Sequence, residues 1–194
     1  MATFWNSVNM DPKRQFRFVL RFPLTGQGLK VPEYVIKTVT KPKVTISSVP
    51  HTFMDHEFKY PGRVTWDPVT ITLVDPGSKE EDMAQALMNK LGKSGYQYPN
   101  TFPQSLESMS KQKANSAVGR VTIAQLNAAG EDTEVWTLVN PFLTSIDLGG
   151  LDYSADELSE ITIELTYDWA VLNGSQATGP ALLKKTNFLP EGTS

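Results

Sequence analysis

The stretch that decides the fold is HEFKYPGRVTWDPVTITLVD, His56 to Asp75. In residues 69–74, aliphatic side chains alternate with threonines, a pattern that predicts a β-strand with one buried face. Earlier in the stretch, Val64 and Trp66 have the opposite parity, and Pro68 lies between the two parts. Proline cannot donate a hydrogen bond to a β-ladder, so we expect a bend there at which the buried face changes. A strand that changes face can serve its own core and a neighbouring molecule.

Immediately upstream, the sequence predicts a long hairpin over residues 45–62. Pro42 and Pro50 bracket the strand-forming segment KVTISSV, and FMDHEFKYPGR has the composition of a tip and its return, with Gly62 supplying the turn. The residues predicted to make contacts from this hairpin are Val49, Phe53, Met54, Phe58, Tyr60 and Arg63. A tip that faces only water is normally polar, so the apolar Val49, Phe53 and Met54 predict a contact with another molecule.

Further strands are predicted on both sides of this segment, in FRFVLRF, YVIKTV, GRVTIAQL, EVWTLV and ITIELTYDW. In FRFVLRF, Phe16, Phe18, Leu20 and Phe22 are expected on one buried face. The strand 161–169 alternates over its whole length, with Trp169 among the inward residues. The residues expected to face away from the core on this strand are Thr162, Glu164, Thr166 and Asp168. The predicted fold is mainly β with one helix (α+β), with two packed antiparallel sheets forming a sandwich or barrel-like subunit.

The one helix is predicted over residues 78–91, in SKEEDMAQALMNKLG. Ser78 and Glu81 form a capping-box pattern, and Gly92 is expected to stop the helix. The apolar stripe expected to pack on the sheet consists of Met83, Ala84, Leu87, Met88 and Leu91. Lys79 and Lys90 are expected to face outward.

The domain boundaries follow from composition. Residues 1–15 form an N-terminal arm, residues 16–172 the β domain, and residues 173–194 a C-terminal tail that is rich in Gly, Pro and Ser. Within the domain, residues 93–117 are rich in Ser, Gln and Asn, which predicts a long variable loop that can include a short helical turn.

The charge distribution is uneven along the 194 residues. Residues 1–120 contain 16 Lys and Arg against 10 Asp and Glu, whereas residues 121–183 contain 10 acids and no Lys or Arg. One interpretation is a solvated acidic face that aids solubility. The other is an electrostatically polarised subunit, whose acidic face lines a space that must not bind polyanions or meets the basic half of a neighbour.

Composition and motifs argue against most kinds of chemistry. The chain has no Cys, which excludes thiol catalysis and zinc–thiolate sites, and its two histidines, His51 and His56, do not make a metal site. It contains no Gly-rich phosphate loop and no Gly-x-Ser-x-Gly elbow. Arg17 and Arg21 lack the interleaved aromatic residues of a base-stacking platform. We therefore expect no enzyme activity, no cofactor, no metal and no sequence-specific nucleic-acid binding.

The sequence also bears on location. No apolar run reaches the roughly 20 residues of a membrane helix, and the N-terminus lacks the order of charged, apolar and small residues of a signal peptide. We expect a protein made in a cytoplasm and kept or assembled there, without membrane association.

Taken in order, these parts resemble the tail tube proteins of contractile-tailed bacteriophages. The residues that carry the resemblance are YPGRVTWDPVTITLVD after the hairpin and EVWTLVNPFLTSIDLGGLDYSADELSEITIELTYDWAVL at the end of the domain. It covers roughly residues 16–169. The family is related in fold to the tubes of pyocins, extracellular contractile injection systems and type VI secretion.

The resemblance implies a hexameric ring in which strands of six subunits close an inner β-barrel. Such rings stack into a tube inside a contractile sheath, assembled in the host cytoplasm as part of a virion. Implied partners are further copies of the chain, the tail sheath protein, the baseplate or tube initiator and the tape-measure protein, with DNA passing through without specific binding. On this view the hairpin 45–62 contacts the next ring, and the residues facing away from the core on strand 161–169 line the lumen.

Three alternatives stay open from the sequence. The chain could be a tube initiator or terminator, which caps a tube instead of repeating along it. It could be the tube ring of a type VI or extracellular contractile injection system. From a different class, it could be a monomeric β-sandwich binding module, which would need an exposed aromatic platform on one face.

Overall fold

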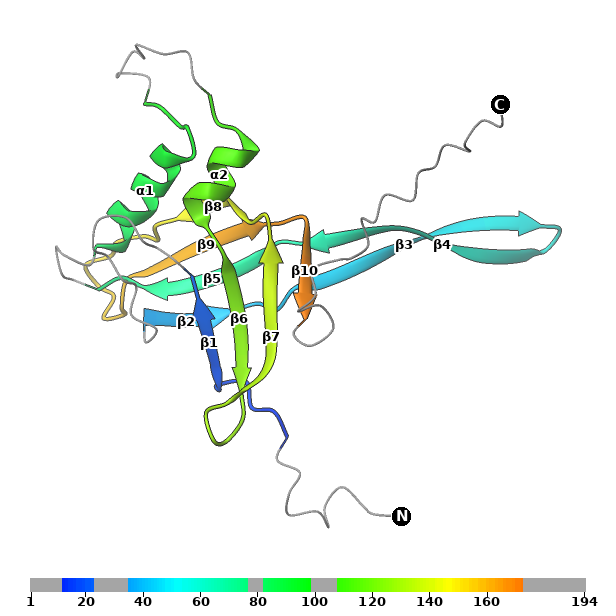
Figure 1. The fold of residues 1–194 in the computed structure, drawn as a ribbon, viewed down its shortest axis with the longest axis horizontal. Coiled ribbons are helices and arrows are strands. Elements are labelled where there is room, and N and C mark those ends of the chain that lie inside the picture. Colours follow the sequence, from blue (N-terminus) through cyan, green and yellow to red (C-terminus); the bar gives the residue numbers. More distant parts are fainter. Residues whose placement is uncertain (1–11, 23–34, 77–81, 99–107, 173–194) are drawn as a thin grey trace, which may run out of the picture.

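Two four-stranded antiparallel sheets pack face to face, and a two-stranded hairpin projects from them (Figure 1). The structure is a computed structural model that describes residues 12–22, 35–76, 82–98 and 108–172. One sheet, here the β6 sheet, has the order β1 (Phe18–Arg21), β6 (Val121–Leu126), β7 (Asp132–Val139), β10 (Trp169–Leu172). The other, the β9 sheet, has the order β2 (Ile36–Val39), β5 (Val69–Val74), β9 (Glu160–Thr166), β8 (Phe142–Asp147). The structure thereby confirms a mainly β fold with antiparallel sheets; most of the predicted arm 1–15 and the predicted tail 173–194 lie outside the described residues.

The core lies between the two sheets, and β5 and β9 form its centre. β5 pairs antiparallel with β9 over its full length, with Ile71 opposite Ile163. Every second residue on each strand is buried, as the alternation predicts. The largest fully buried side chains are Val69, Ile71, Leu73, Met83, Leu87, Val118, Val121, Pro141, Ile161, Ile163 and Leu165. Threonine and glutamate occupy most of the intervening positions, which lie on the polar, opposite face of the sheet.

Helix α1 (Met83–Lys93) contributes Met83 and Leu87 to the core. Asp82 caps it by accepting a hydrogen bond from the Gln85 amide at 3.1 Å, whereas the predicted capping box at 78–81 lies outside the described residues. The helix runs two residues beyond the predicted end at Leu91, because Gly92 is accommodated within its last turn.

The expectation that Lys90 faces outward is wrong. Lys90 is 5% exposed, its Nζ donates to the Ala117 carbonyl at 2.7 Å, and it lies 5.5 Å from the centroid of the Phe22 ring. Burial lowers the pKa of Lys90 to about 8, with a smaller contribution from the charge of Lys93. The reason for the burial is a second helix that packs against α1.

This second helix, α2 (Lys111–Val118), falls in the segment predicted as a loop over 93–117. Ser110 caps it by accepting a hydrogen bond from the Lys113 amide at 3.3 Å, and Gly119 ends it with a φ of 75°. Only Ala114 and Val118 are buried on this helix, so its apolar pattern is weak. The carbonyl of Ala117, in the last turn of α2, accepts the hydrogen bond from Lys90 and holds that side chain in its buried position.

The predicted strand 161–169 is divided between the two sheets. β9 ends at Thr166, and β10 begins at Trp169 in the β6 sheet. Tyr167 stays buried and donates its hydroxyl to the Asp67 carbonyl at 2.8 Å, whereas Trp169 is 46% exposed, contrary to expectation. Phe16 also departs from the prediction, since it precedes β1 and its side chain is 74% exposed.

Replacing Leu87 with alanine should lower the free energy of unfolding by about 2–5 kcal/mol, because it leaves a cavity between α1 and the sheets. The measurement is urea unfolding followed by circular dichroism. The matched control is Gln85→Ala, an exposed residue on the same helix, which should change stability by less than about 0.5 kcal/mol. Equal effects for the two variants would contradict the placement of α1 on the core.

Candidate functional site

The most exposed structural feature is the hairpin of β3 (Lys43–Phe53) and β4 (His56–Asp67), which points away from the sandwich (Figure 1). It extends beyond the predicted 45–62 at both ends. All of β3 is exposed, and β4 is exposed except at Trp66 and Asp67. An isolated two-stranded hairpin is marginally stable in water, so a projecting one is typical of a segment that contacts another molecule.

The turn of the hairpin is at Met54 and Asp55, not at Gly62 as predicted. Met54 adopts the left-handed conformation with a φ of 53°. Gly62 lies inside β4, where a Cβ atom would approach the Ser47 Oγ to 2.4 Å. Any larger residue would displace the Ser47 hydroxyl, so the close approach of the two strands favours glycine there.

The pairing of β3 with β4 shifts register between Ile46 and Ser48. Across this bulge β3 advances by two residues while β4 advances by three, and the Arg63 amide donates to Ser47 Oγ at 2.9 Å. The apolar pairs consequently move from even positions of β3, such as Ile46, to odd ones, such as Val49. A bulge re-aims side chains in this way, so the base and the tip present their apolar residues in different directions.

The predicted contact residues of the hairpin are all exposed. The tip, defined here as residues 49–60, carries Val49 (57% exposed), Phe53 (60%), Met54 (83%), Phe58 (46%) and Tyr60 (56%). Arg63 lies at the bulge below the tip. Five large apolar side chains on one short projection form a patch of the kind that marks an interaction site.

The outer face of the β9 sheet carries three of the four residues predicted to face away from the core. Thr162, Glu164 and Thr166 alternate with the buried residues of β9, and Glu164 is exposed between Thr70 of β5 and Ser145 of β8. Asp168 does not belong to this face. It lies in the turn to β10, where it accepts hydrogen bonds from Lys111 and from Asn140, both at 2.7 Å. The Lys111 ammonium, followed by the Asn140 amide, lowers the pKa of the Asp168 carboxyl.

The uneven charge of the sequence is partly cancelled by folding. Within the described part of the chain, ion pairs join four acids of the second half to bases of the first: Asp132 to Arg21, Glu134 to Lys13 and Lys41, Glu160 to Lys37, and Asp168 to Lys111. Glu164 and the loop between β8 and β9, which carries Asp152, Asp156 and Glu157, retain the acidic character. The polarised surface is therefore smaller than the sequence indicates.

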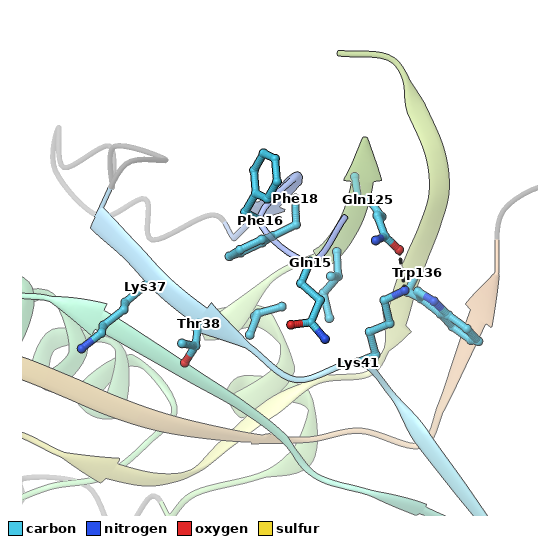
Figure 2. A pocket seen from close by; sticks show the side chains of 11 residues that line it. Gln15, Phe16, Phe18, Lys37, Thr38, Lys41, Gln125 and Trp136 are labelled. Atoms are coloured by element: carbon cyan, nitrogen blue, oxygen red, sulfur yellow. Dashed lines mark hydrogen bonds between the residues drawn. The ribbon is translucent and has the colours of Figure 1, made fainter. Parts of the chain in front are cut away.

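A cavity of about 600 Å³ lies between β1 and β6 of one sheet and β2 of the other (Figure 2). Its apolar lining includes Phe16, Phe18, Val39, Ile123 and Trp136. Its polar lining includes Gln15, Lys37, Thr38, Lys41 and Gln125. We call it the β1–β2 cavity; sequence analysis did not identify it, because its walls come from segments that are far apart in the chain.

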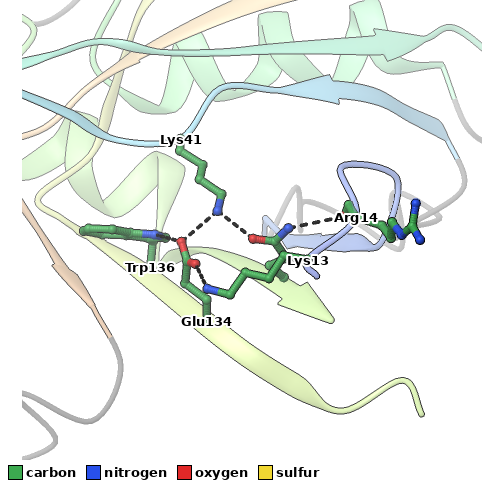
Figure 3. A network of polar contacts seen from close by, with 6 residues as sticks. Lys13, Arg14, Lys41, Glu134 and Trp136 are labelled. Atoms are coloured by element: carbon green, nitrogen blue, oxygen red, sulfur yellow. Dashed lines mark hydrogen bonds and ion pairs between the residues drawn. The ribbon is translucent and has the colours of Figure 1, made fainter. Parts of the chain in front are cut away.

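Beside this cavity, Glu134 of β7 joins three parts of the chain (Figure 3). It pairs with Lys13 of the N-terminal segment, accepts from Lys41 at 2.8 Å, and accepts from the Trp136 indole at 2.6 Å. Lys41 also donates to Gln125 at 2.6 Å and lies between β2 and β3, at the base of the hairpin. Glu134 thus ties the hairpin base and the N-terminal segment to the β6 sheet.

These contacts lower the pKa of Glu134 to about 2, chiefly through the hydrogen bond from Lys13 and then the one from Lys41. No local signal marks Glu134 in the sequence, because Lys41 and Lys13 are 93 and 121 residues away. In the part of the chain that the structure describes, no three His, Asp or Glu side chains are placed to hold a metal ion. Neither described helix is long and apolar enough to cross a membrane.

A lowered folded-state pKa means that the ionised Glu134 stabilises the fold above its ordinary pKa of 4.5, and that this stabilisation is lost as pH falls toward about 2. The variant Glu134→Gln should therefore be less stable than the unchanged chain at pH 6, and the difference should shrink across that acidic window. Urea unfolding at several pH values measures both. The control is Glu131→Gln, an exposed carboxylate in the turn before β7. A difference between Glu134→Gln and the unchanged chain that is independent of pH would contradict the ion-pair assignment.

Comparison with known proteins gives structural similarity only. Neither a protein-family model nor a curated protein sequence matches the chain. Among solved structures, the anti-feeding prophage (AFP) baseplate contains a chain with a TM-score of 0.59 and 13% identity, covering 86% of this chain and 99% of that one. A chain of the AFP tube terminating cap has a TM-score of 0.58 and 18% identity, covering 89% and 98%.

A third similar chain comes from the sheath/tube terminator of PVC, an extracellular contractile injection system, in its extended state. It has a TM-score of 0.58 and 20% identity, and the match covers 84% of this chain and 98% of that one. Each of these neighbours is matched over nearly its whole length. The chain therefore has the fold found in chains of a baseplate, a tube terminating cap and a sheath/tube terminator of contractile injection systems.

Proposed function

We propose that this chain is a non-catalytic structural subunit of a contractile tail tube, in which rings of six copies stack into a hollow tube. The observation that carries the proposal is the projecting hairpin with an apolar tip, on a fold found in assembled contractile injection systems. A head-to-tail contact that closes forms a ring, and one that does not close extends a filament. In this proposal the sheet edges form the contacts that close each ring, and the hairpin forms the contacts that stack one ring on the next.

The dimensions of the hairpin suit a contact between rings. Strands rise about 3.3 Å per residue, so an arm of 11 residues, the length of β3, reaches roughly 35 Å from the sandwich. Its apolar tip is too far from the core to be covered by the described part of the chain. A second copy in the next ring is the partner that removes this surface from water.

The polar outer face of the β9 sheet is proposed to line the lumen. In a ring of six, Glu164 would form a circle of like charges that repels DNA phosphates, so that DNA passes without binding. The tape-measure protein would occupy the same channel before ejection. The other partners that we propose are the sheath and the baseplate or tube initiator. The proposed location is the virion of a phage.

A second candidate function is that of a terminal subunit, which caps a tube. Similarity to chains of the AFP tube terminating cap and the PVC sheath/tube terminator favours it. Negative-stain electron microscopy of the purified protein separates the candidates. Long tubes support the repeating subunit, isolated rings support the cap, and a monomer at high concentration supports a free-standing β-sandwich module.

Shortening the hairpin should abolish tube formation while leaving the sandwich folded. Ser48 and Pro61 are paired, so residues 49–60 can be replaced with an Asn-Gly turn that joins them. Electron microscopy should show rings or single subunits but no tubes. Thermal unfolding followed by circular dichroism should give an unchanged midpoint. The control is Thr52→Ala, which removes no large apolar side chain from the tip. Normal tubes from the shortened chain would contradict a role of the hairpin in stacking.

Replacing Glu164 with lysine should produce tubes that bind duplex DNA in a manner that weakens steeply with salt, because six added cations would face the channel. Asp168 is left unchanged, since its contacts with Lys111 and Asn140 hold the β9–β10 turn. The measurement is retention of DNA fragments by tubes at increasing salt. The control, Glu131→Lys, makes the same charge change in an exposed turn. Equal retention by the two variants would show that Glu164 does not face the lumen.

A further inference from the structure

We propose that the two histidines of the hairpin tip make the stacking contact sensitive to pH, so that the tube comes apart when the solution becomes mildly acidic. This inference rests on the proposed function, in which the tip docks on a copy in the next ring, and it states how that contact is regulated. The chain contains two histidines, His51 and His56, and both lie within the tip.

Both histidines lie on the same face of the hairpin as the apolar side chains of the tip. Paired residues of a β-ladder share a face, and so do residues two apart on one strand. The pairs on this face are Val49 with Tyr60, His51 with Phe58, and Phe53 with His56. The pairs on the opposite face of the tip are Pro50 with Lys59 and Thr52 with Glu57. A partner that covers the apolar side chains therefore also covers both imidazoles.

The imidazoles lie among the aromatic rings of this face. The ring centroids of His56 and Phe58 are 4.8 Å apart, with an interplanar angle of 76°, which is an edge contact. Across the ladder, His51 is opposite Phe58 and His56 is opposite Phe53. Both histidines are exposed in the single chain, so their charge is hydrated until a partner docks. A neutral imidazole suits such an apolar contact, whereas a charged one does not.

The tip offers no carboxylate on this face to compensate for a charged imidazole. β3 and β4 are the elements that face the two histidines, because the tip projects from the sandwich (Figure 1). Within residues 49–60, the other titratable side chains are Asp55, Glu57, Lys59 and Tyr60. Glu57 is paired with Lys59 at 3.6 Å on the opposite face, and Asp55 lies in the turn. Tyr60 shares the face but contributes a phenol and not a carboxylate.

Docking is therefore coupled to protonation. An imidazole in water gains a proton below about pH 6.5, and a charge that is buried without a partner destabilises the contact that buries it. Free copies must release up to two protons per tip before they dock, so assembly weakens as the pH falls. Protonation of Glu164 in the proposed lumen would have the opposite effect, because it removes repulsion between like charges. The direction of the response thus identifies the histidines.

The concentration of chain that stays unassembled tests the inference. Tubes are formed at about pH 7.5, 6.5 and 5.5 at constant ionic strength and pelleted, and the protein left in the supernatant is measured. For the unchanged chain we expect this concentration to rise below about pH 6.5, by up to roughly tenfold per pH unit for each histidine, and to fall again when the pH is restored. Circular dichroism should show a folded chain throughout, because the pKa of Glu134, at about 2, lies below this range.

Two pairs of variants make the test specific. The double variant His51→Gln, His56→Gln keeps polar side chains that do not titrate, so its supernatant concentration should not depend on pH over this range. In the second comparison, at about pH 7.5, His51→Lys places a permanent charge on the apolar face, and Thr52→Lys places the same charge on the opposite face. We expect only His51→Lys to raise the supernatant concentration.

The outcomes separate this inference from the proposed function. Tubes whose supernatant concentration is independent of pH, or a double variant with the same pH dependence as the unchanged chain, would overturn the inference and leave the tube subunit in place. If the double variant forms no tubes, equal effects of His51→Lys and Thr52→Lys would overturn it instead. The absence of tubes from the unchanged chain at every pH would overturn the repeating tube subunit and this inference with it.

Discussion

The pairing of β5 with β9 is the contact on which the remainder of the structure depends. Each strand turns aliphatic side chains inward at every second position, and Ile71 and Ile163, which are opposite each other, are both fully buried. The β6 sheet, α1 and α2 all complete this one apolar layer. Because a slip of one residue would expose the whole inward set, the register of the central pair is strongly determined. The position of everything attached to β5, including the hairpin, follows from it.

The hairpin is held where it leaves the sandwich, and it is exposed beyond that point. Tyr167 donates to the Asp67 carbonyl at the end of β4, and Lys41 binds Glu134 at the start of β3. Both anchors connect the hairpin to strands of the core, so its direction is set by the rigid part of the molecule. An arm that is fixed at its base and carries an apolar tip loses less conformational entropy on docking than a flexible loop would.

In the assembly that we propose, apolar contacts would contribute more than charge. Several acids of the second half are already paired within the chain, which leaves less charge to attract a neighbour. Burying the exposed apolar side chains at the tip, in contrast, lowers the free energy of the system.

The sequence by itself determined β5 and most of β9, because alternation of aliphatic residues with polar ones is a local property of these strands. It also indicated the hairpin, its exposed apolar residues and the apolar stripe of α1. It did not predict β8, and it did not predict that β10 belongs to the other sheet. It did not predict α2, whose eight residues bury only Ala114 and Val118, or the inward position of Lys90, which depends on the Ala117 carbonyl of that helix. The β1–β2 cavity, the contacts of Glu134 and the separation of Asp168 from Glu164 were likewise decided by tertiary structure. Each depends on side chains that are distant in the chain and become neighbours only when the two sheets pack, so no local pattern carries them.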